Sequence, residues 1–181
     1  KDAFKKQFTD IREDKFRVRM SSIGRPLCQL QMEKSGAKRE AQPYNNKLRF
    51  IFGDMIEAIT MLLLKASGTV VDSEQKQVTR KSKYFESGLN GTYDVEIDGK
   101  IYDIKSASDW AFKNKFSMGF DAVVEKDVFG YKSQGYLYAD TENKKFGGWI
   151  VVNKSTGEMC IVSPPRDDTK HKKEALQLAD D

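Results

Sequence analysis

The sequence predicts an α/β domain built around one central mixed β-sheet that is flanked by helices. Three observations predict it: a long apolar helical stretch, a pair of alternating runs joined by a tight turn, and two later strand-like runs that follow a helical segment. Along the chain the order is three helices, three strands, one helix and two strands. With 181 residues, the chain is long enough for one domain with its own core.

The segment before the first strand is expected to be helical. Residues 1–19 carry apolar side chains at helical spacing, which predicts an amphipathic helix. Ser21 or Ser22 is placed to cap a second helix. After a polar loop, residues 47–66 are apolar on most faces, so we expect a helix in the centre of the core that ends at Gly68.

Two alternating runs, 92–97 and 100–106, are joined by Asp98-Gly99, which is a strong signal for a two-residue hairpin turn. Counting back from this turn pairs neighbouring positions and brings Asp94 opposite Asp103. Alternation then predicts an apolar face that carries Tyr93, Val95, Ile97, Tyr102 and Ile104. The opposite, polar face carries Thr92, Asp94, Glu96, Asp103 and Lys105.

The polar face of this hairpin has two interpretations. A face that is merely solvated is common in antiparallel sheets, and this alternative stays open. Two opposed aspartates, however, repel each other by a few kcal/mol at an effective dielectric of about 20, so a site that keeps both charges needs a cation. Oxygen ligands suit Mg²⁺ or Mn²⁺ rather than zinc. Lys105 lies on the same face and is placed to contact a phosphate or polarise a water.

Composition excludes several classes of protein. The only histidine, His171, lies in a charged C-terminal stretch, which argues against Ser-His-Asp or Cys-His catalysis and histidine-rich zinc sites. Cys28 and Cys160 are far apart and do not form a disulfide scaffold. No apolar run reaches the roughly 20 residues of a membrane helix, so we expect a cytoplasmic protein, in the host cytoplasm if the source is viral. The net charge of +4 permits a nucleic-acid partner without establishing one.

The segment 88–106 resembles the core of the PD-(D/E)xK nuclease superfamily. In that pattern an Asp is followed, across a hairpin, by an acidic residue, any residue and then Lys; here these are Asp94 and Asp103-Ile104-Lys105. Tyr93 stands where the family name has Pro, a departure shared by the RecB-like branch, whose pattern is glycine-rich before the Asp.

Two further matches favour this RecB-like exonuclease branch, which includes phage recombination and CRISPR-associated nucleases. Glu57 follows Gly53 in the long helix, where the branch places a Glu or His as an extra metal ligand, and Asp54 competes for that role. Gln134 and Tyr138 are similar to the branch's Gln-x-x-x-Tyr motif, whose members share one helix face. Some relatives hold an iron–sulfur cluster through four cysteines, whereas here we expect no cluster.

The resemblance implies a restriction-endonuclease-like αβββαβ core with an N-terminal helical extension, a nuclease domain over 1–165 and a charged tail over 166–181. It also implies a Mg²⁺- or Mn²⁺-dependent DNA exonuclease that processes ends in recombination, repair or replication. The implied metal ligands are Glu57, Asp94, Asp103 and the carbonyl of Ile104. Lys105 would orient water or stabilise the transition state, and Gln134 and Tyr138 would position DNA.

Two alternatives remain at this stage. One is a structure-specific or restriction-like endonuclease, and the other is a non-catalytic nucleic-acid-binding module. The expected partner is DNA, single- or double-stranded at its ends, with a homo-oligomer or a recombination partner protein as further candidates and no membrane. Basic and aromatic residues that could line a strand path are Lys81, Lys83, Tyr84, Lys113, Lys115 and Phe116.

Overall fold

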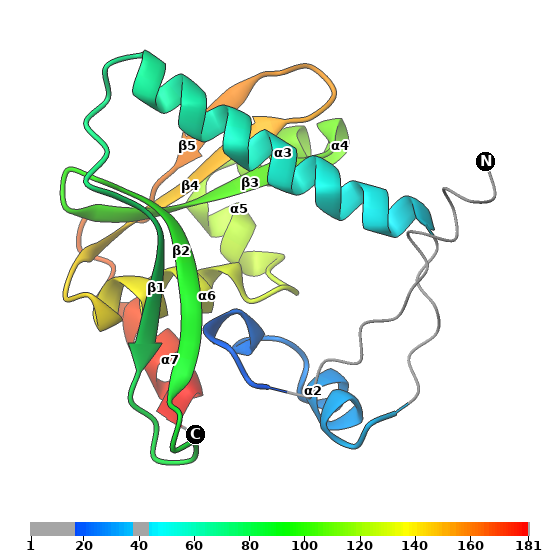
Figure 1. Ribbon diagram of the computed structural model, residues 1–181, viewed down its shortest axis with the longest axis vertical. Helices are drawn as coiled ribbons and strands as arrows, with labels where there is room; N and C mark the ends of the chain where they lie inside the picture. The colour runs from blue at the N-terminus through cyan, green and yellow to red at the C-terminus, as the bar shows by residue number, and fades with distance from the viewer. Residues whose placement is uncertain (1–16, 38–43, 181) are drawn as a thin grey trace.

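A five-stranded mixed sheet in the order β1-β2-β3-β4-β5 organises the chain, as the sequence predicts (Figure 1). β3 and β4 are parallel, and the other neighbouring strands are antiparallel. The structure is a computed structural model that describes residues 17–37 and 44–180. The strands are β1 (Ser73–Arg80), β2 (Leu89–Ile97), β3 (Lys100–Ala107), β4 (Lys145–Asn153) and β5 (Met159–Val162).

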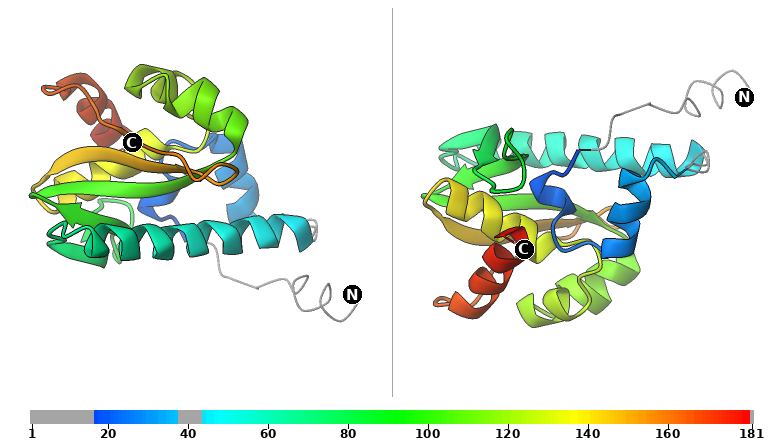
Figure 2. Two further views of the ribbon diagram at one scale, coloured as in Figure 1. Left: turned by 90° about the horizontal axis from the view of Figure 1, so that it is seen from above. Right: turned by 90° about the horizontal axis from the view of Figure 1, so that it is seen from below.

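The helices lie on both faces of this sheet, which gives three layers. Figure 2 shows α3 alone along one face, with α4, α5, α6 and α7 on the other. The helical elements are η1 (Met20–Ser22), α2 (Leu27–Lys34), α3 (Tyr44–Ala66), α4 (Asp109–Ala111), η2 (Phe112–Phe116), α5 (Phe120–Glu125), α6 (Tyr131–Thr141) and α7 (Thr169–Asp180).

The core is divided by the sheet. Trp149 and Leu137 are fully buried on the α6 face, in the two larger clusters that join the sheet to the helices packed there. On the α3 face a smaller cluster gathers Met61 with Val95 and Ile104. Few buried residues therefore join α3 to the sheet.

The predicted central position of the long helix is wrong. α3 forms over Tyr44–Ala66 and Gly68 follows it at φ +79°, as expected of a helix C-terminus, but only Thr60 and Met61 are buried in it. The sheet covers one side of the helix, so the apolar residues on its other side stay exposed within the described part of the chain. Its length and hydropathy do not qualify it as a membrane span, and neither do those of any other described helix.

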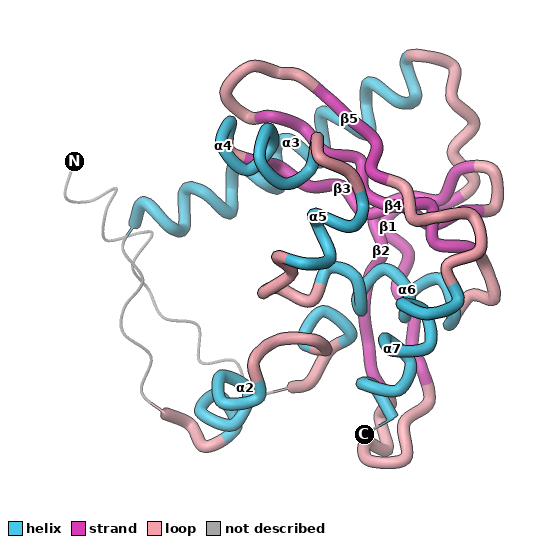
Figure 3. The backbone as a smooth tube through the Cα atoms, turned by 180° about the vertical axis from the view of Figure 1, so that it is seen from behind, coloured by secondary structure: helices cyan, strands magenta, loops and turns pink. Residues whose placement is uncertain are grey.

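The N-terminal helices also differ from the prediction. Ser21 and Ser22 lie in the 3-10 helix η1, and the next helix begins only at Leu27. Gly24 adopts φ +88° and Pro26 precedes α2 directly, so the backbone cannot continue as one helix through them. Figure 3 shows α2 standing apart from the layers. The helix predicted over 1–19 lies largely outside the described residues.

The predicted hairpin register is confirmed near the turn. Ile97 pairs with Lys100, Glu96 with Ile101, and Val95 with Tyr102. Four residues of the predicted apolar face, Val95, Ile97, Tyr102 and Ile104, lie in one cluster under α3.

Tyr93 does not lie on the predicted apolar face. It belongs to the cluster on the α6 face, and its hydroxyl donates to Glu96 Oε2 at 3.2 Å, so these two residues share a side. Strict alternation would have placed them on opposite sides. The break coincides with Gln75 of β1, next to the β2 segment at Asp94, where φ is +47°. Glu96, expected on a polar face, is buried and also paired with Lys144.

The stretch 166–181, expected as a charged tail, contains a packed helix. Ala175 of α7 is fully buried in the cluster that includes Tyr136 of α6. Asp168 accepts from the Tyr136 hydroxyl and lies 2.9 Å from Nδ1 of His171. The packed layer on the α6 face therefore extends past residue 165.

Candidate functional site

The candidate site lies where β2 separates from β3. Their backbone pairing runs from the turn to Val95↔Tyr102 and is not continued to Asp94 and Asp103. Beyond that point β3 stays paired with β4, so that Asp103 lies beside Trp149, while β2 stays with β1. In Figure 1, β1 and β2 run together away from β3 and β4, which opens the sheet at this position.

Asp94 fills the place that the missing backbone pairing leaves. Its Oδ2 accepts from the backbone N–H of Ile104 at 2.6 Å, so the side chain bridges the two strands. Burial, and then the nearby Asp103 carboxylate, raises the pKa of Asp94 well above its usual range. Ionisation of this buried carboxyl is therefore unfavourable in free energy, and a bound cation would offset that penalty.

Asp103 and Lys105 form a tight ion pair on the α6 side of the opening. The Lys105 ammonium lies 2.5 Å from Oδ2 of Asp103, a side chain only 2% exposed. The Lys105 ammonium is therefore the partner of this enclosed oxygen. Burial alone would lower the pKa of Lys105, but Asp103 and Asp94 raise it above its usual range.

Glu57 approaches the same opening from α3, on the opposite face. Burial and then the charge of Asp103 raise the pKa of its carboxyl, which places it within electrostatic reach of the pair. Oε1 of Glu57 accepts from the Gln75 amide. Asp54, the competing candidate one turn earlier, is exposed and lies with Glu57 and Gln75 along a shallow cavity of about 450 Å³ between α3 and β1.

The four residues thus meet at one opening, but they do not form a closed ligand set. Across residues 17–37 and 44–180, no three carboxylate, thiol or imidazole side chains are gathered tightly enough to hold one ion. Each carboxylate instead has a protein partner: Asp94 the Ile104 amide, Asp103 the Lys105 ammonium and Glu57 the Gln75 amide. The carbonyl of Ile104 remains a predicted ligand.

The charges at the opening nevertheless fit a divalent cation. Three carboxylates face one ammonium there, so the negative charge is not balanced. Burial, and then the charge of Asp103, raises the pKa of both Asp94 and Glu57. Donors made only of oxygen suit a hard ion such as Mg²⁺ or Mn²⁺.

Gln134 and Tyr138 lie on one face of α6, as their spacing predicts, and Gln134 Nε2 donates to the Tyr138 hydroxyl at 3.0 Å. Tyr138 is buried against β2 at Gly91. A Cβ on Gly91 would lie 2.4 Å from Cε1 of the tyrosine ring, which explains physically why a glycine stands three residues before Asp94. The charges of Asp103, Lys105 and Asp94 all act on the Tyr138 hydroxyl, so it lies near the opening.

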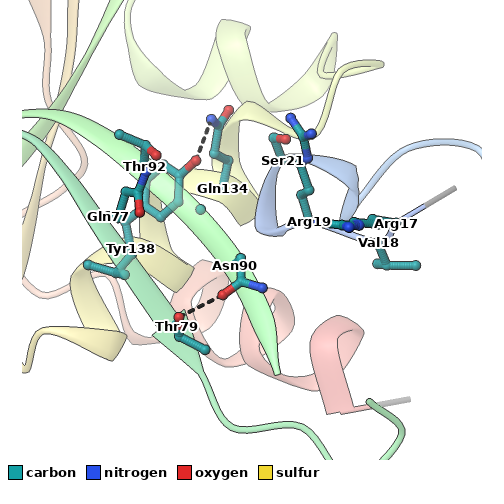
Figure 4. A pocket seen from close by; sticks show the side chains of 12 residues that line it. Arg17, Val18, Arg19, Ser21, Gln77, Thr79, Asn90, Thr92, Gln134 and Tyr138 are labelled. Atoms are coloured by element: carbon teal, nitrogen blue, oxygen red, sulfur yellow. Dashed lines mark hydrogen bonds between the residues drawn. The ribbon is translucent and has the colours of Figure 1, made fainter. Parts of the chain in front are cut away.

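A polar pocket of about 580 Å³ adjoins this pair. Figure 4 shows Gln134 and Tyr138 at one side of it and the N-terminal segment with Arg17 and Arg19 at the other. Among the described residues, no carboxylate lines this pocket. The remaining lining residues come from the segment before η1, from η1 itself and from β1 and β2: Val18, Ser21, Gln77, Val78, Thr79, Asn90, Gly91 and Thr92.

Tyr131 is a site residue that sequence reasoning missed. Its ring lies under the Lys105 ammonium, 4.8 Å from the ring centroid, and under that of Lys115 at 5.3 Å. It begins α6 three residues before Gln134, and its place beside the motif was the only signal available. The structure also removes Lys115 and Phe116 from the proposed strand path: both are buried, and Lys115 donates to the Lys126 carbonyl.

Comparisons with known proteins show a similar fold and no matching family. No family model matches the sequence, and no curated protein matches it significantly. Among solved structures, the crystal structure of SSO0001 is similar, with a TM-score of 0.52 and 12% sequence identity. The match covers 98% of this chain and 80% of that chain, so the two proteins share the fold.

Proposed function

We propose that the chain is a Mg²⁺- or Mn²⁺-dependent DNA nuclease of the PD-(D/E)xK superfamily, within its RecB-like branch, and that it acts as an exonuclease on DNA ends. One observation carries the proposal: Asp94, Asp103, Lys105 and Glu57, which the resemblance selects from distant parts of the sequence, meet at a single opening of the sheet. The intact set of carboxylates and lysine favours an enzyme over a binding module.

Each residue at the opening has a distinct proposed task. Asp94 and Asp103, with Glu57 from the other face, would hold the ion. When bound, the ion supplies Lewis acidity that activates water and neutralises charge growing on the phosphate. Lys105, which pairs with Asp103, would hold the attacking water or meet charge on the phosphate oxygens. Tyr131 beneath it fixes where the ammonium can lie.

The pocket beside Gln134 and Tyr138 is the proposed route of the DNA strand. Arg17 and Arg19 supply positive charge, and the other lining side chains supply hydrogen bonds without a competing carboxylate. Thr92 of the pocket lies two residues before Asp94 on β2, about 7 Å along an extended strand. A phosphodiester backbone could therefore pass from the pocket to the opening within one or two nucleotides.

The test compares linear DNA with a covalently closed circle of the same sequence, in Mg²⁺ and in EDTA. The proposal expects the linear form to be degraded only with metal, and the circle to survive. Asp94→Asn and Asp103→Asn should remove cleavage. Asp98→Asn, exposed in the turn of the same hairpin, is the matched control that should cleave normally.

The outcomes separate the alternatives. Rapid nicking of the circle would replace the exonuclease by an endonuclease. Cleavage that persists in EDTA would refute the metal site. If no nucleic acid of any form is cut with either ion but DNA is still bound, the binding-module reading stands instead.

A further inference from the structure

The outward side of α3 carries a continuous row of large apolar side chains. The opposite side of the helix faces the sheet with Met61 and Glu57, and no described element covers the outward side (Figure 2). A surface helix ordinarily places polar residues there. The row, called here the outer stripe, consists of Ile51, Phe52, Met55, Ile59, Leu62 and Leu63, which are 36–66% exposed.

The spacing within the outer stripe is that of helix-to-helix packing. Starting from Leu48, apolar residues recur alternately after four and three positions, at Phe52, Met55, Ile59 and Leu62. The only charged residues between 50 and 64 are Asp54 and Glu57, and by the helical period both lie on the sheet side. The stripe is therefore a neutral seam whose periodicity suits a second helix laid along it.

We infer that the outer stripe joins two copies of this chain, with α3 packed against α3 of the second copy. Six large side chains, each about half exposed, offer on the order of 600 Å² per copy, close to the roughly 800 Å² of a stable interface. An uncharged apolar stripe is complementary to itself across a two-fold axis. It offers no cation to a nucleic acid, so DNA is not its occupant.

The chain's own N-terminal segment is a poorer fit to the stripe. The alternating spacing of four and three positions holds there only for Phe4, Phe8 and Ile11, because the next position in the series is Lys15. As a helix these three positions would extend over about 10 Å, whereas the stripe from Ile51 to Leu63 extends over about 18 Å. A second copy of α3 matches the stripe along its whole length. For this reason the proposal commits to self-association.

Pairing through the outer stripe leaves the opening of the sheet accessible, because Glu57 lies on the opposite side of the same helix. It also adds burial to a helix that buries only Thr60 and Met61 against its own domain. The partner would thereby hold α3, and with it Glu57, against the sheet. This last step rests on the proposed function, whereas the association itself does not.

The test measures molar mass by sedimentation at protein concentrations up to about 100 µM. The wild type should have twice the mass of the chain, and Ile59→Glu should have the mass of one chain at the same concentrations. Val128→Glu is the matched control: Val128 is 62% exposed and lies outside α3, so this variant should remain a dimer. Leu62→Glu should repeat the effect of Ile59→Glu if the latter fails to fold.

A wild type with the mass of one chain at the highest concentration would overturn the inference, and so would an Ile59→Glu variant that remains a dimer. If the wild type is a monomer and Ile59→Glu melts more than about 5 °C lower, the stripe is covered from within the chain, and the inference is again wrong. The molar mass measured by sedimentation is independent of metal binding and of DNA cleavage, so this test is separate from that of the proposed function. A dimer that cuts no DNA would defeat only the proposed function, and an active monomer only the inferred interface.

Discussion

The Lys105 ammonium lies 2.5 Å from Oδ2 of Asp103, inside the opening between β2 and β3. Within residues 17–37 and 44–180 it is the only ammonium paired with these carboxylates, while Asp94 and Glu57 bring two further carboxylates to the same place. Lys105 therefore has two roles in the proposed nuclease. It balances part of the negative charge in the metal-free protein, and it becomes available to the phosphate when an ion takes over that balance.

Lys105→Ala should therefore affect both stability and cleavage. Removal of one partner from a buried ion pair typically costs about 3 kcal/mol, so the metal-free variant should unfold more readily than the wild type. With Mg²⁺ present, much of this loss should be recovered, while cleavage stays about 10² to 10³ below the wild-type rate. Thermal unfolding with EDTA and with Mg²⁺, together with single-turnover cleavage, measures the two effects. Lys100→Ala, exposed at the start of the same strand, is the control that should change neither.

Mg²⁺ should stabilise the wild type even when no DNA is present. An ion that binds the folded state and not the unfolded chain adds about 2.7 kcal/mol of stability at a hundred times its dissociation constant. Asp103→Asn should lose this response, because it removes the carboxylate that faces both other acids. Asp98→Asn, in the turn of the hairpin, should keep it. A wild type that melts at the same temperature in EDTA and in excess Mg²⁺ would argue against the ion site.

The stability of the metal-free protein should fall as the pH rises through the range between the ordinary and the raised pKa of Asp94. Burial and Asp103 raise the folded-state pKa, so within this range the folded protein binds more protons at Asp94 than the unfolded chain does. Unfolding then becomes easier with each increase in pH. In EDTA, the wild type should lose more stability across this range than Asp94→Asn does, and saturating Mg²⁺ should remove the difference. Identical pH profiles for the two proteins would show that Asp94 does not titrate in this way.

Local signals predicted much of the site. The Asp98-Gly99 turn and the alternation beside it determine which residues pair, because each needs only a few neighbouring residues to specify it. The Gln134–Tyr138 pair likewise follows from helical spacing alone. The separation of β2 from β3 at Asp94 could not be predicted, since it involves the positive φ of Gln75 on a third strand, which no pattern within the hairpin reveals.

The position of α3 was missed for a different reason. A helix that is apolar all round is compatible both with the centre of a domain and with an outer helix that has a partner on each side. The sequence carries the same residues in either case, and only the placement of the sheet shows that Phe52 and Leu62 point away from it.

Tyr131 could not be identified from the sequence, because an aromatic residue at the start of a helix has no distinguishing pattern of its own.

Two glycine substitutions should separate a glycine required by packing from one that is tolerated. A Cβ on Gly91 would lie 2.4 Å from Cε1 of the buried Tyr138 ring, whereas a Cβ on Gly53 meets nothing closer than Oγ of Ser106 at 3.7 Å. Gly91→Ala should therefore displace Tyr138 and destabilise the fold by about 1–3 kcal/mol, the usual cost of overpacking. Gly53→Ala, within α3, should instead stabilise it by up to about 1 kcal/mol through helix propensity. Chemical denaturation of both variants measures these changes. If Gly91→Ala is as stable as the wild type, the close packing of Tyr138 on β2 is incorrect, and with it the placement of Gln134 beside the opening.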